Sequence, residues 1–284
     1  GTVKTITWNA LADFGNQENS SMKARLVATD SFGNQSIPVS SANFIADTKV
    51  PLIANVLAVQ NSGNNYVTIS YDLSDVSTSS VALAVSADGG STWNVTSTNV
   101  SGAVGGNISA GTGKTITWNA GSDFPGQQIA NMRVRLQATD VYNNIGNNVE
   151  SADFALDTKT PLITNVYAAQ ILNSDNFSFT YDLFDSGAVI VNLDISSDGG
   201  STWNVATSSA TGAVGSGVTP GFGKTISWNG NADFTNHQND NMKVRVRATD
   251  SFNNTSINFE SAVFVLDTLA PAPAIVTDLQ TQPV

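Results

Sequence analysis

The sequence predicts an all-β protein made of tandem β-sandwiches of seven strands each, with a repeat of 110 residues. The repeat is the first observation: residues 50–159 and 160–269 align without insertion or deletion, and DGGSTWNV at 88–95 returns at 198–205. The second is the pattern inside one repeat, where runs of alternating apolar and polar residues are separated by turn residues. No segment shows convincing helical periodicity.

The period also defines the expected domains. Each whole module is long enough to bury a core of its own. The domains are the second half of a module at 1–49, whole modules at 50–159 and 160–269, and the start of a next module or a tail at 270–284. Because the outer parts are incomplete, we expect a longer tandem array, continuing upstream with residues like 50–110 and downstream with more of the module begun at Pro271.

Within one module the strands are expected in a regular order. A hairpin is expected at the Asp-Gly-Gly turn, because Asp-Gly is a favoured hairpin corner. Seven short strands with regular turns are the pattern of a β-sandwich. The segments are 162–170, 176–183, 188–205 (two strands folded as the hairpin), 223–230, 242–250 and 261–268.

Alternation also predicts the core. Ile226 and Trp228 share one face of their strand, and Val244 and Val246 share one face of theirs. Each module has two tryptophans, which we interpret as core or hairpin-packing residues because each lies in an alternating apolar run. These are Trp93 and Trp118 in one module and Trp203 and Trp228 in the next.

The first 49 residues contain three of these strand segments, GTVKTITWNA, SMKARLVATD and SANFIADT. By alternation they present an apolar face with Ile6, Trp8 and Leu26, and no partner sheet within the same segment. We therefore expect exposed apolar surface and open strand edges there.

Composition limits the functional classes. The net charge of −11 argues against binding to nucleic acid or to an anionic membrane, and no stretch is long and apolar enough for a membrane helix. Cysteine is absent, so disulfides, catalytic thiols and zinc–thiolate sites are excluded. Few charged residues, many Asn, Ser and Thr, and modular repetition favour an extracellular or cell-surface protein of bacterial type.

Two stretches carry a resemblance to a known family: ATDSFGNQS…FIADTKVP (28–51) and ATDSFNNTS…FVLDTLAP (248–271). They resemble the end of fibronectin type III and related bacterial immunoglobulin-like modules, which occur as tandem repeats in large surface or secreted proteins such as adhesins. The resemblance implies an immunoglobulin-like sandwich and Ca²⁺ at the junctions between modules. The long DGGSTW hairpin departs from the typical adhesin module.

That hairpin has a resemblance of its own. SADGGSTW (86–93) and SSDGGSTW (196–203) resemble the Asp-box of sialidase propellers, in which the Asp closes a hairpin. A propeller would repeat the box about every 40–50 residues, whereas here the spacing is 110 and no arginine cluster surrounds it. We interpret Asp88 and Asp198 as structural turn residues rather than part of a glycosidase.

Conventional catalysis finds little support in the sequence. The sole histidine, His237, lies in a polar loop, and no Ser-His-Asp set repeats with the modules. No Gly-rich phosphate loop precedes a helix. We expect no enzymatic activity.

Aspartates near the module ends suggest a metal site. In a sandwich of this order the linker arrives beside two loops of the next module, so oxygen donors that suit Ca²⁺ would converge there. The alternative is that these residues are turn residues that bind their own backbone. The two expected sets are Asp47 with Asp72, Asp75 and Asp140, and Asp157 with Asp182, Asp185 and Asp250.

A second possibility concerns Lys4, Lys114 and Lys224, which are in phase with the Ile and Trp of their strand. A Lys–Asn or Lys–Asp isopeptide cross-link is known from some bacterial surface domains of this kind. A lysine that extends to solvent at a strand end explains the pattern equally well.

These observations favour a structural repeat segment of a large extracellular or cell-surface protein, forming a stalk, fibre or surface array. Its expected partners are neighbouring modules of the same chain and other copies in an array. The alternatives are a glycan- or protein-binding adhesion module, or an accessory region of a secreted hydrolase.

Overall fold

A computed structural model describes residues 3–273, so residues 274–284 of the expected tail lie outside the described part. The chain divides into two compact units, with the change between Asp157 and Thr158. The all-β prediction is confirmed, because antiparallel strands make up both units and the described helices are single turns. No described helix is long and apolar enough to span a membrane.

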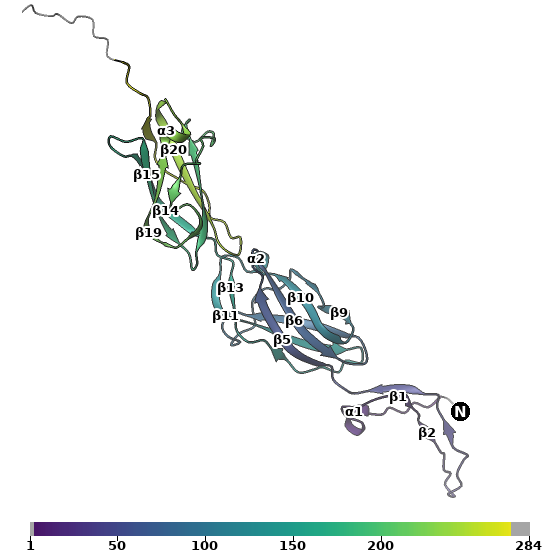
Figure 1. Cartoon of the computed structure of the whole chain (residues 1–284). Coiled ribbons are helices and arrows are strands. Elements are labelled where there is room, and N and C mark those ends of the chain that lie inside the picture. Colours follow the sequence, from purple (N-terminus) through teal and green to yellow (C-terminus); the bar gives the residue numbers. More distant parts are fainter. Residues whose placement is uncertain (1–2, 274–284) are drawn as a thin grey trace, which may run out of the picture. The chain divides into compact units, whose positions relative to one another are not determined.

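The module at 50–159 contains two antiparallel sheets. One has the order β5-β6-β10-β8, and the other has the order β12-β11-β7-β9, with β13 also paired to β11 (Figure 1). The elements are β5 (Leu52–Gln60), β6 (Tyr66–Ser74), β7 (Ser79–Ser86), β8 (Val100–Gly102), β9 (Gly105–Ile108), β10 (Gly111–Asn119), α2 (Ala120–Asp123), β11 (Gln128–Asp140), β12 (Val149–Glu150) and β13 (Phe154–Asp157).

The module at 160–269 has the same topology. Its sheets have the orders β14-β15-β19-β17 and β18-β16-β20-β21, with β22 also paired to β20. The elements are β14 (Leu162–Gln170), β15 (Asn176–Phe184), β16 (Val189–Ser196), β17 (Thr211–Gly212), β18 (Gly215–Val218), β19 (Gly221–Asn229), α3 (Gly230–Asp233), β20 (Gln238–Thr249), β21 (Phe259–Glu260) and β22 (Phe264–Asp267).

The strand count differs from the expected seven, since the described residues of each whole module form nine strands. The predicted return strand of the hairpin is reduced to one bridge, between Ile195 and Val205. Two short strands, β17 and β18, come from Gly-rich sequence that gave no strand signal, because Gly is disfavoured in strands. The last predicted segment, 261–268, contains one short strand, β22, and a further short strand, β21, precedes it.

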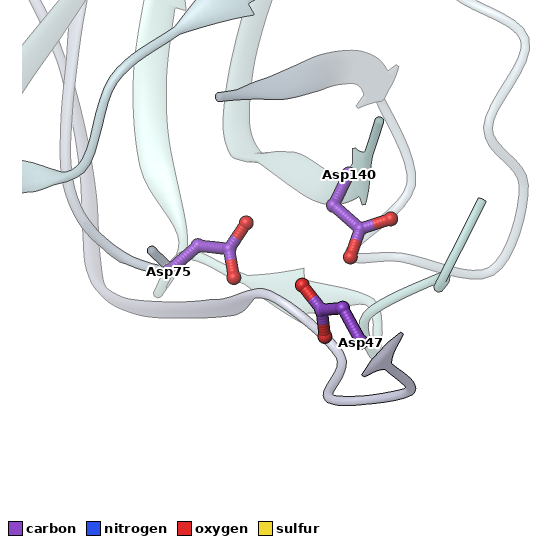
Figure 2. Close-up of side chains that lie close together, drawn as sticks. All are labelled: Asp47, Asp75 and Asp140. Carbon is purple, nitrogen blue, oxygen red and sulfur yellow. The ribbon is translucent and has the colours of Figure 1, made fainter. Parts of the chain in front are cut away.

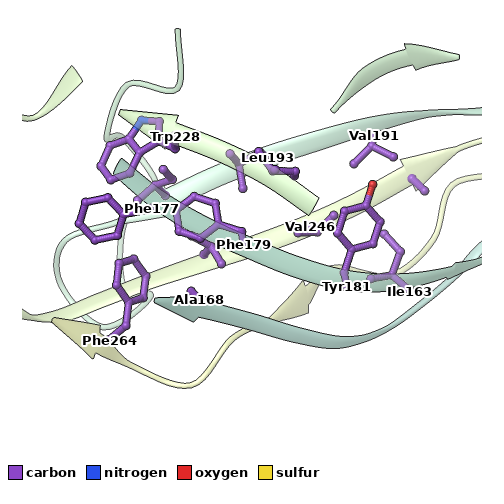
Figure 3. Packing of buried hydrophobic residues seen from close by; sticks show 14 of the residues in the cluster. Ile163, Ala168, Phe177, Phe179, Tyr181, Val191, Leu193, Trp228, Val246 and Phe264 are labelled. Atoms are coloured by element: carbon purple, nitrogen blue, oxygen red, sulfur yellow. The ribbon is translucent and has the colours of Figure 1, made fainter. Parts of the chain in front are cut away.

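The predicted core residues are confirmed. Ile226, Trp228, Val244 and Val246 are fully buried, as is Trp118 in the other module. Figure 3 shows Trp228 in the core of the 160–269 module, beside Phe177, Phe179 and Phe264. Phe177 lies 5.1 Å from Trp228 and 5.7 Å from Phe264, centroid to centroid, the spacing of favourable tilted aromatic pairs.

A one-turn helix follows the TITW or TISW segment in each described copy of the repeat, which the sequence analysis did not predict. In the 50–159 module Asn119 caps α2 by accepting a hydrogen bond from the Ser122 N–H, as Asn commonly does at a helix start. The helix ends at Asp123, whose Oδ2 accepts a hydrogen bond of 2.9 Å from Trp118 Nε1. The turn therefore supplies the polar partner that the buried indole requires.

A glutamine joins the first and last strands of the 50–159 module. Gln60, at the end of β5, donates from Nε2 to the Asp157 carbonyl at 2.8 Å. Its Oε1 accepts from the Asp157 N–H at 2.7 Å. The side-chain amide thus pairs with the backbone of β13 as a strand residue would, and Gln170 makes the same two bonds to Asp267.

The described residues 3–49 form one helical turn and two separate two-stranded sheets. β1 pairs with β4 and β2 pairs with β3, and Ile6, Trp8 and Leu26 are exposed, as predicted. The expected strand GTVKTITWNA is wrong, since residues 3–9 form none. The equivalent strand β10 pairs with β6 and β8, which have no counterpart in 1–49. The elements are α1 (Ala10–Asp13), β1 (Glu18–Met22), β2 (Arg25–Leu26), β3 (Val39–Ser40) and β4 (Phe44–Asp47).

Candidate metal centre

Three of the predicted aspartates of the first set lie together. Asp47 ends β4, Asp75 follows β6, and Asp140 is the last residue of β11. One carboxylate oxygen from each lies within 4.8 Å of the others. Figure 2 shows the three carboxylates pointing toward one another from separate segments.

Asp140 is held by the turn that follows it. Its Oδ1 accepts hydrogen bonds of 2.8 Å from the backbone N–H groups of Tyr142 and Asn144, and its Oδ2 accepts one from Asn144 Nδ2. Asn143 has a φ of 65°, a conformation that Asn tolerates better than most residues. The turn alternative is therefore correct for Asp140, and this bonding also fixes the direction of its carboxylate.

Asp75 is held by hydroxyl groups. Its Oδ2 accepts hydrogen bonds from Ser77 Oγ at 2.7 Å and from Ser79 Oγ at 3.4 Å. Ser79 is almost fully buried at the start of β7, which gives this turn a fixed anchor.

Asp47 has the least complete bonding of the three. Its Oδ1 accepts from the Lys49 N–H at 2.9 Å, whereas its buried Oδ2 has no hydrogen-bond partner. Burial raises the pKa of Asp47 above its ordinary value, and the charges of Asp140 and Asp75 raise it further, against the lowering effect of the Lys49 N–H. Asn144 Nδ2 also donates to the Asp47 carbonyl at 3.2 Å.

This arrangement is suited to a cation. Two unit charges within 4.8 Å repel by on the order of 3 kcal/mol at an effective dielectric constant of about 20. A buried carboxylate oxygen without a donor adds a desolvation cost. A bound metal ion would neutralise the repulsion and coordinate the unpartnered Oδ2 of Asp47, so the residues present fit such an ion.

The structure corrects the predicted ligand set at Asp72, which is not part of the group among the described residues. Its carboxylate accepts from Asn55 Nδ2 at 2.6 Å and from the Gly113 N–H at 2.8 Å. Asp182 has the same bonds in the next module, from Asn165 and Gly223. These acids stabilise a bulge in the first strand of each module.

The equivalents of the first group one period later are Asp157, Asp185 and Asp250. Asp157 ends the first unit, while Asp185 and Asp250 belong to the second. Asp250 has the bonding of Asp140, since its Oδ1 accepts from the N–H groups of Phe252 and Asn254 at 2.8 Å. The metal site expected from the sequence at these three residues stays a prediction.

The hairpin acids have a structural role, as interpreted. Asp88 accepts a hydrogen bond of 2.8 Å from the Thr92 N–H and others from the hydroxyls of Thr92 and Ser86. These bonds, the Thr92 N–H first, lower the pKa of Asp88 to about 2. Asp198 has the same bonds and the same lowered pKa.

The hairpin tryptophans lie outside the core. Arg135 lies over the ring of Trp93 at 4.3 Å from the centroid, and Arg245 lies over Trp203 at 4.5 Å. Of the two interpretations offered for the tryptophans, hairpin packing therefore applies to this pair and core packing to Trp118.

His237 lies in a loop beside α3. Its ring stacks on Phe234 with centroids 3.9 Å apart, and its Nδ1 is 2.6 Å from the Thr235 carbonyl oxygen. Lys224, one of the lysines considered for a cross-link, has its Nζ 3.3 Å from Thr219 Oγ1.

Comparison with known proteins gives a distant neighbour. No protein-family model matches the sequence, and no curated protein matches it. Among solved structures, the chain is similar to the sialic-acid-binding region of an adhesin from Streptococcus sanguinis SK1, solved bound to 3'sLn. The identity is 11%, the match covers 76% of this chain and 78% of that chain, and the TM-score is 0.24.

Proposed function

We propose that this chain is a structural segment of a large extracellular or cell-surface protein, in which equal modules act as spacers of a stalk, fibre or surface array. The observation that supports the proposal is the equality of the two whole modules. They share strand order, core positions, capped helical turns and hairpin bonds at a spacing of 110 residues. A dedicated ligand site would more usually distinguish one module from the other.

The sheet order supports an immunoglobulin-like assignment within this proposal. The order β5-β6-β10-β8 corresponds to the A-B-E-D sheet of that fold, and β7 and β11 correspond to strands C and F. β12 and β13 take the place of strand G. The short strand β9, which pairs with β7, is an addition at the edge.

The proposed role is non-enzymatic, and the proposed partners are neighbouring modules and other copies of the protein. Each module would add roughly 35–45 Å if its strands run along the axis, at about 3.3 Å per residue plus a linker.

We further propose that Asp47, Asp75 and Asp140 bind Ca²⁺. Ca²⁺ accepts six to eight oxygen ligands in flexible geometry, whereas Mg²⁺ demands a near-ideal octahedron. Three carboxylates from separate segments suit the more tolerant ion. Such an ion would tie Asp47, which precedes the module, to two turns of that module.

The spacer proposal is tested by adding modules. Chains with one, two and three further copies of residues 160–269 are made, and their maximum dimension is measured by small-angle X-ray scattering. We expect a constant increment per copy. A dimension that stays nearly constant as modules are added would contradict the spacer role.

The calcium proposal is tested by titration after chelation, with melting temperature and calorimetric binding as readouts. We expect Ca²⁺ to raise the melting temperature by mass action on the folded state. Asp75→Asn should weaken binding at this site. Asp72→Asn is the matched control, because it changes the same residue type three positions away and outside the group. An equal loss of Ca²⁺ binding in both variants, or no Ca²⁺ binding by the parent chain, would refute the site.

A further inference from the structure

Among the described residues, 3–49 carry half of a module core without the strands that complete it in the other modules. Ile6, Trp8, Leu26 and Phe44, the acceptor face, have exposed fractions of 71%, 42%, 57% and 37%. The residues one period later are Ile116, Trp118 and Leu136, each fully buried, and Phe154, which is 8% exposed. The same side chains at the same positions are therefore core in one copy and surface in the other.

Several local hydrogen bonds of this half are those of a complete module. Trp8 Nε1 donates to Asp13 Oδ2 at 2.8 Å, as Trp118 does to Asp123. β1 pairs with β4 through the bulge found between β11 and β13. Asp30 closes its turn by the same bonds as Asp140. The turns and strand pair next to the acceptor face are thus formed without the rest of the module, whereas the strand at residues 3–9 is not.

The complete module identifies which strands lie beside such a face and complete its core. Ile116 pairs with Ile69, and Trp118 pairs with Val67, both on β6. Leu136 pairs with Leu83 on β7. These partners come from residues 50–110, and β6 and β7 supply much of the apolar cluster around Trp118. Residues 3–9 form no strand, and the equivalent strand of the complete module, β10, pairs with β6. The backbone of residues 3–9 therefore lacks the same neighbour as the apolar side chains.

We propose that residues 1–49 bind a donor segment with the sequence pattern of residues 50–110, supplied from outside the two complete modules. The donor adds counterparts of β5, β6 and β7, and residues 3–9 become a strand by pairing with it. The product is a third module. This binding uses the apolar face and the strand ladder, so it requires neither Ca²⁺ nor the spacer role.

The test adds a separately produced polypeptide of residues 50–110 to the whole chain, in the presence of a chelator. Hydrogen exchange of residues 3–9 and 18–30 is followed, together with stoichiometry by native mass spectrometry. We expect a one-to-one complex and slowed exchange in both segments. Exchange as fast as in the free chain, at a saturating donor concentration, would overturn the proposal.

Matched variants distinguish binding through the acceptor face from non-specific hydrophobic association. Ile6→Asp should abolish the complex, whereas Thr5→Asp should retain it, because Ile116 is buried and Thr115 is exposed at the equivalent positions. On the donor, Ile69→Asp should prevent binding and Ser70→Asp should not. Equal effects within either pair would contradict the assigned faces.

A fusion covers the case in which the free donor aggregates. Residues 50–110 are placed directly before Gly1, as they precede Gly111 in the complete module. We expect residues 3–9 to become protected and a third unfolding transition to appear. Unprotected residues 3–9 in the fusion, or self-association through the acceptor face that the donor cannot displace, would refute the inference.

Discussion

Replacement of Trp118 by alanine tests how the module core is held. The side chain is fully buried and donates a hydrogen bond to Asp123. An aromatic side chain buries about 200 Å², which at about 25 cal/mol/Å² corresponds to about 5 kcal/mol. Measured losses for buried aromatics are about 3–5 kcal/mol. A domain of this size has a free energy of unfolding of about 5–15 kcal/mol, so Trp118→Ala should leave the module marginally stable.

The chain contains its own control for this experiment. Trp8 occupies the equivalent position and makes the equivalent bond to Asp13, but its exposed fraction is 42%. Trp8→Ala should therefore cost less than Trp118→Ala, at most about 3 kcal/mol, since 42% of Trp8 is already exposed to water. Trp228→Ala, in the second module, should match Trp118→Ala because Trp228 is also fully buried.

The assay is differential scanning calorimetry of the whole chain. Trp118→Ala should lower the melting temperature of the 50–159 module by on the order of 20 °C, given about 4–8 °C per kcal/mol for a small domain. Its transition should then separate from that of the 160–269 module. The other transition should stay in place because each whole module has a buried core of its own. A Trp118→Ala profile like that of the parent, or an equal loss in Trp8→Ala, would refute the core assignment.

Three further predictions concern turns and surface pairs. Because the pKa of Asp88 is lowered to about 2 from 3.8, its contribution to stability is complete above pH 3.8 and is lost as the pH falls through 2; an NMR titration midpoint near 3.8 would contradict this. Arg135→Ala removes the cation over Trp93 and should cost about 0.5–1 kcal/mol by chemical denaturation, and an unchanged stability would show that the stack contributes nothing. Gly102→Ala should destabilise the module far more than Gly105→Ala, although both glycines have positive φ. A Cβ at Gly102 would lie 2.4 Å from a carbonyl oxygen, whereas a Cβ at Gly105 would meet open space. Equal melting temperatures of the two variants would exclude the clash.

The TITW segment shows where prediction from sequence ends. Residues 115–118 form a strand, whereas residues 5–8, which have the same four side chains, do not. The alternating pattern predicts which face is apolar in both places, because that depends only on side-chain order. Strand formation depends on hydrogen bonds to a neighbour, and residues 1–49 have no counterpart of β6.

The metal centre shows a similar limit. Asp75 and Asp140 were predictable because each lies where a strand ends, at the same end of the sandwich. Asp72 was wrongly included because it is close to Asp75 in sequence, yet it lies inside β6. At about 3.3 Å per residue and with alternating side-chain directions, three positions along an extended chain separate two carboxylates by about 10 Å. The partner of Asp72, Asn55, has a φ of 54° at a bulge that no sequence pattern indicated.

The pairing of Gln60 with Asp157 has a mechanical consequence for a module that carries tension. Pulling on the two ends of the 50–159 module applies force at the start of β5 and at the end of β13. Gln60 joins the far end of β5 directly to Asp157, where the chain leaves the module. The load therefore has a short path along β5 and through the two Gln60–Asp157 hydrogen bonds, and the β5–β6 ladder lies beside that path. Much of the core lies beside this path rather than in it, so the module would yield first at its outermost strand.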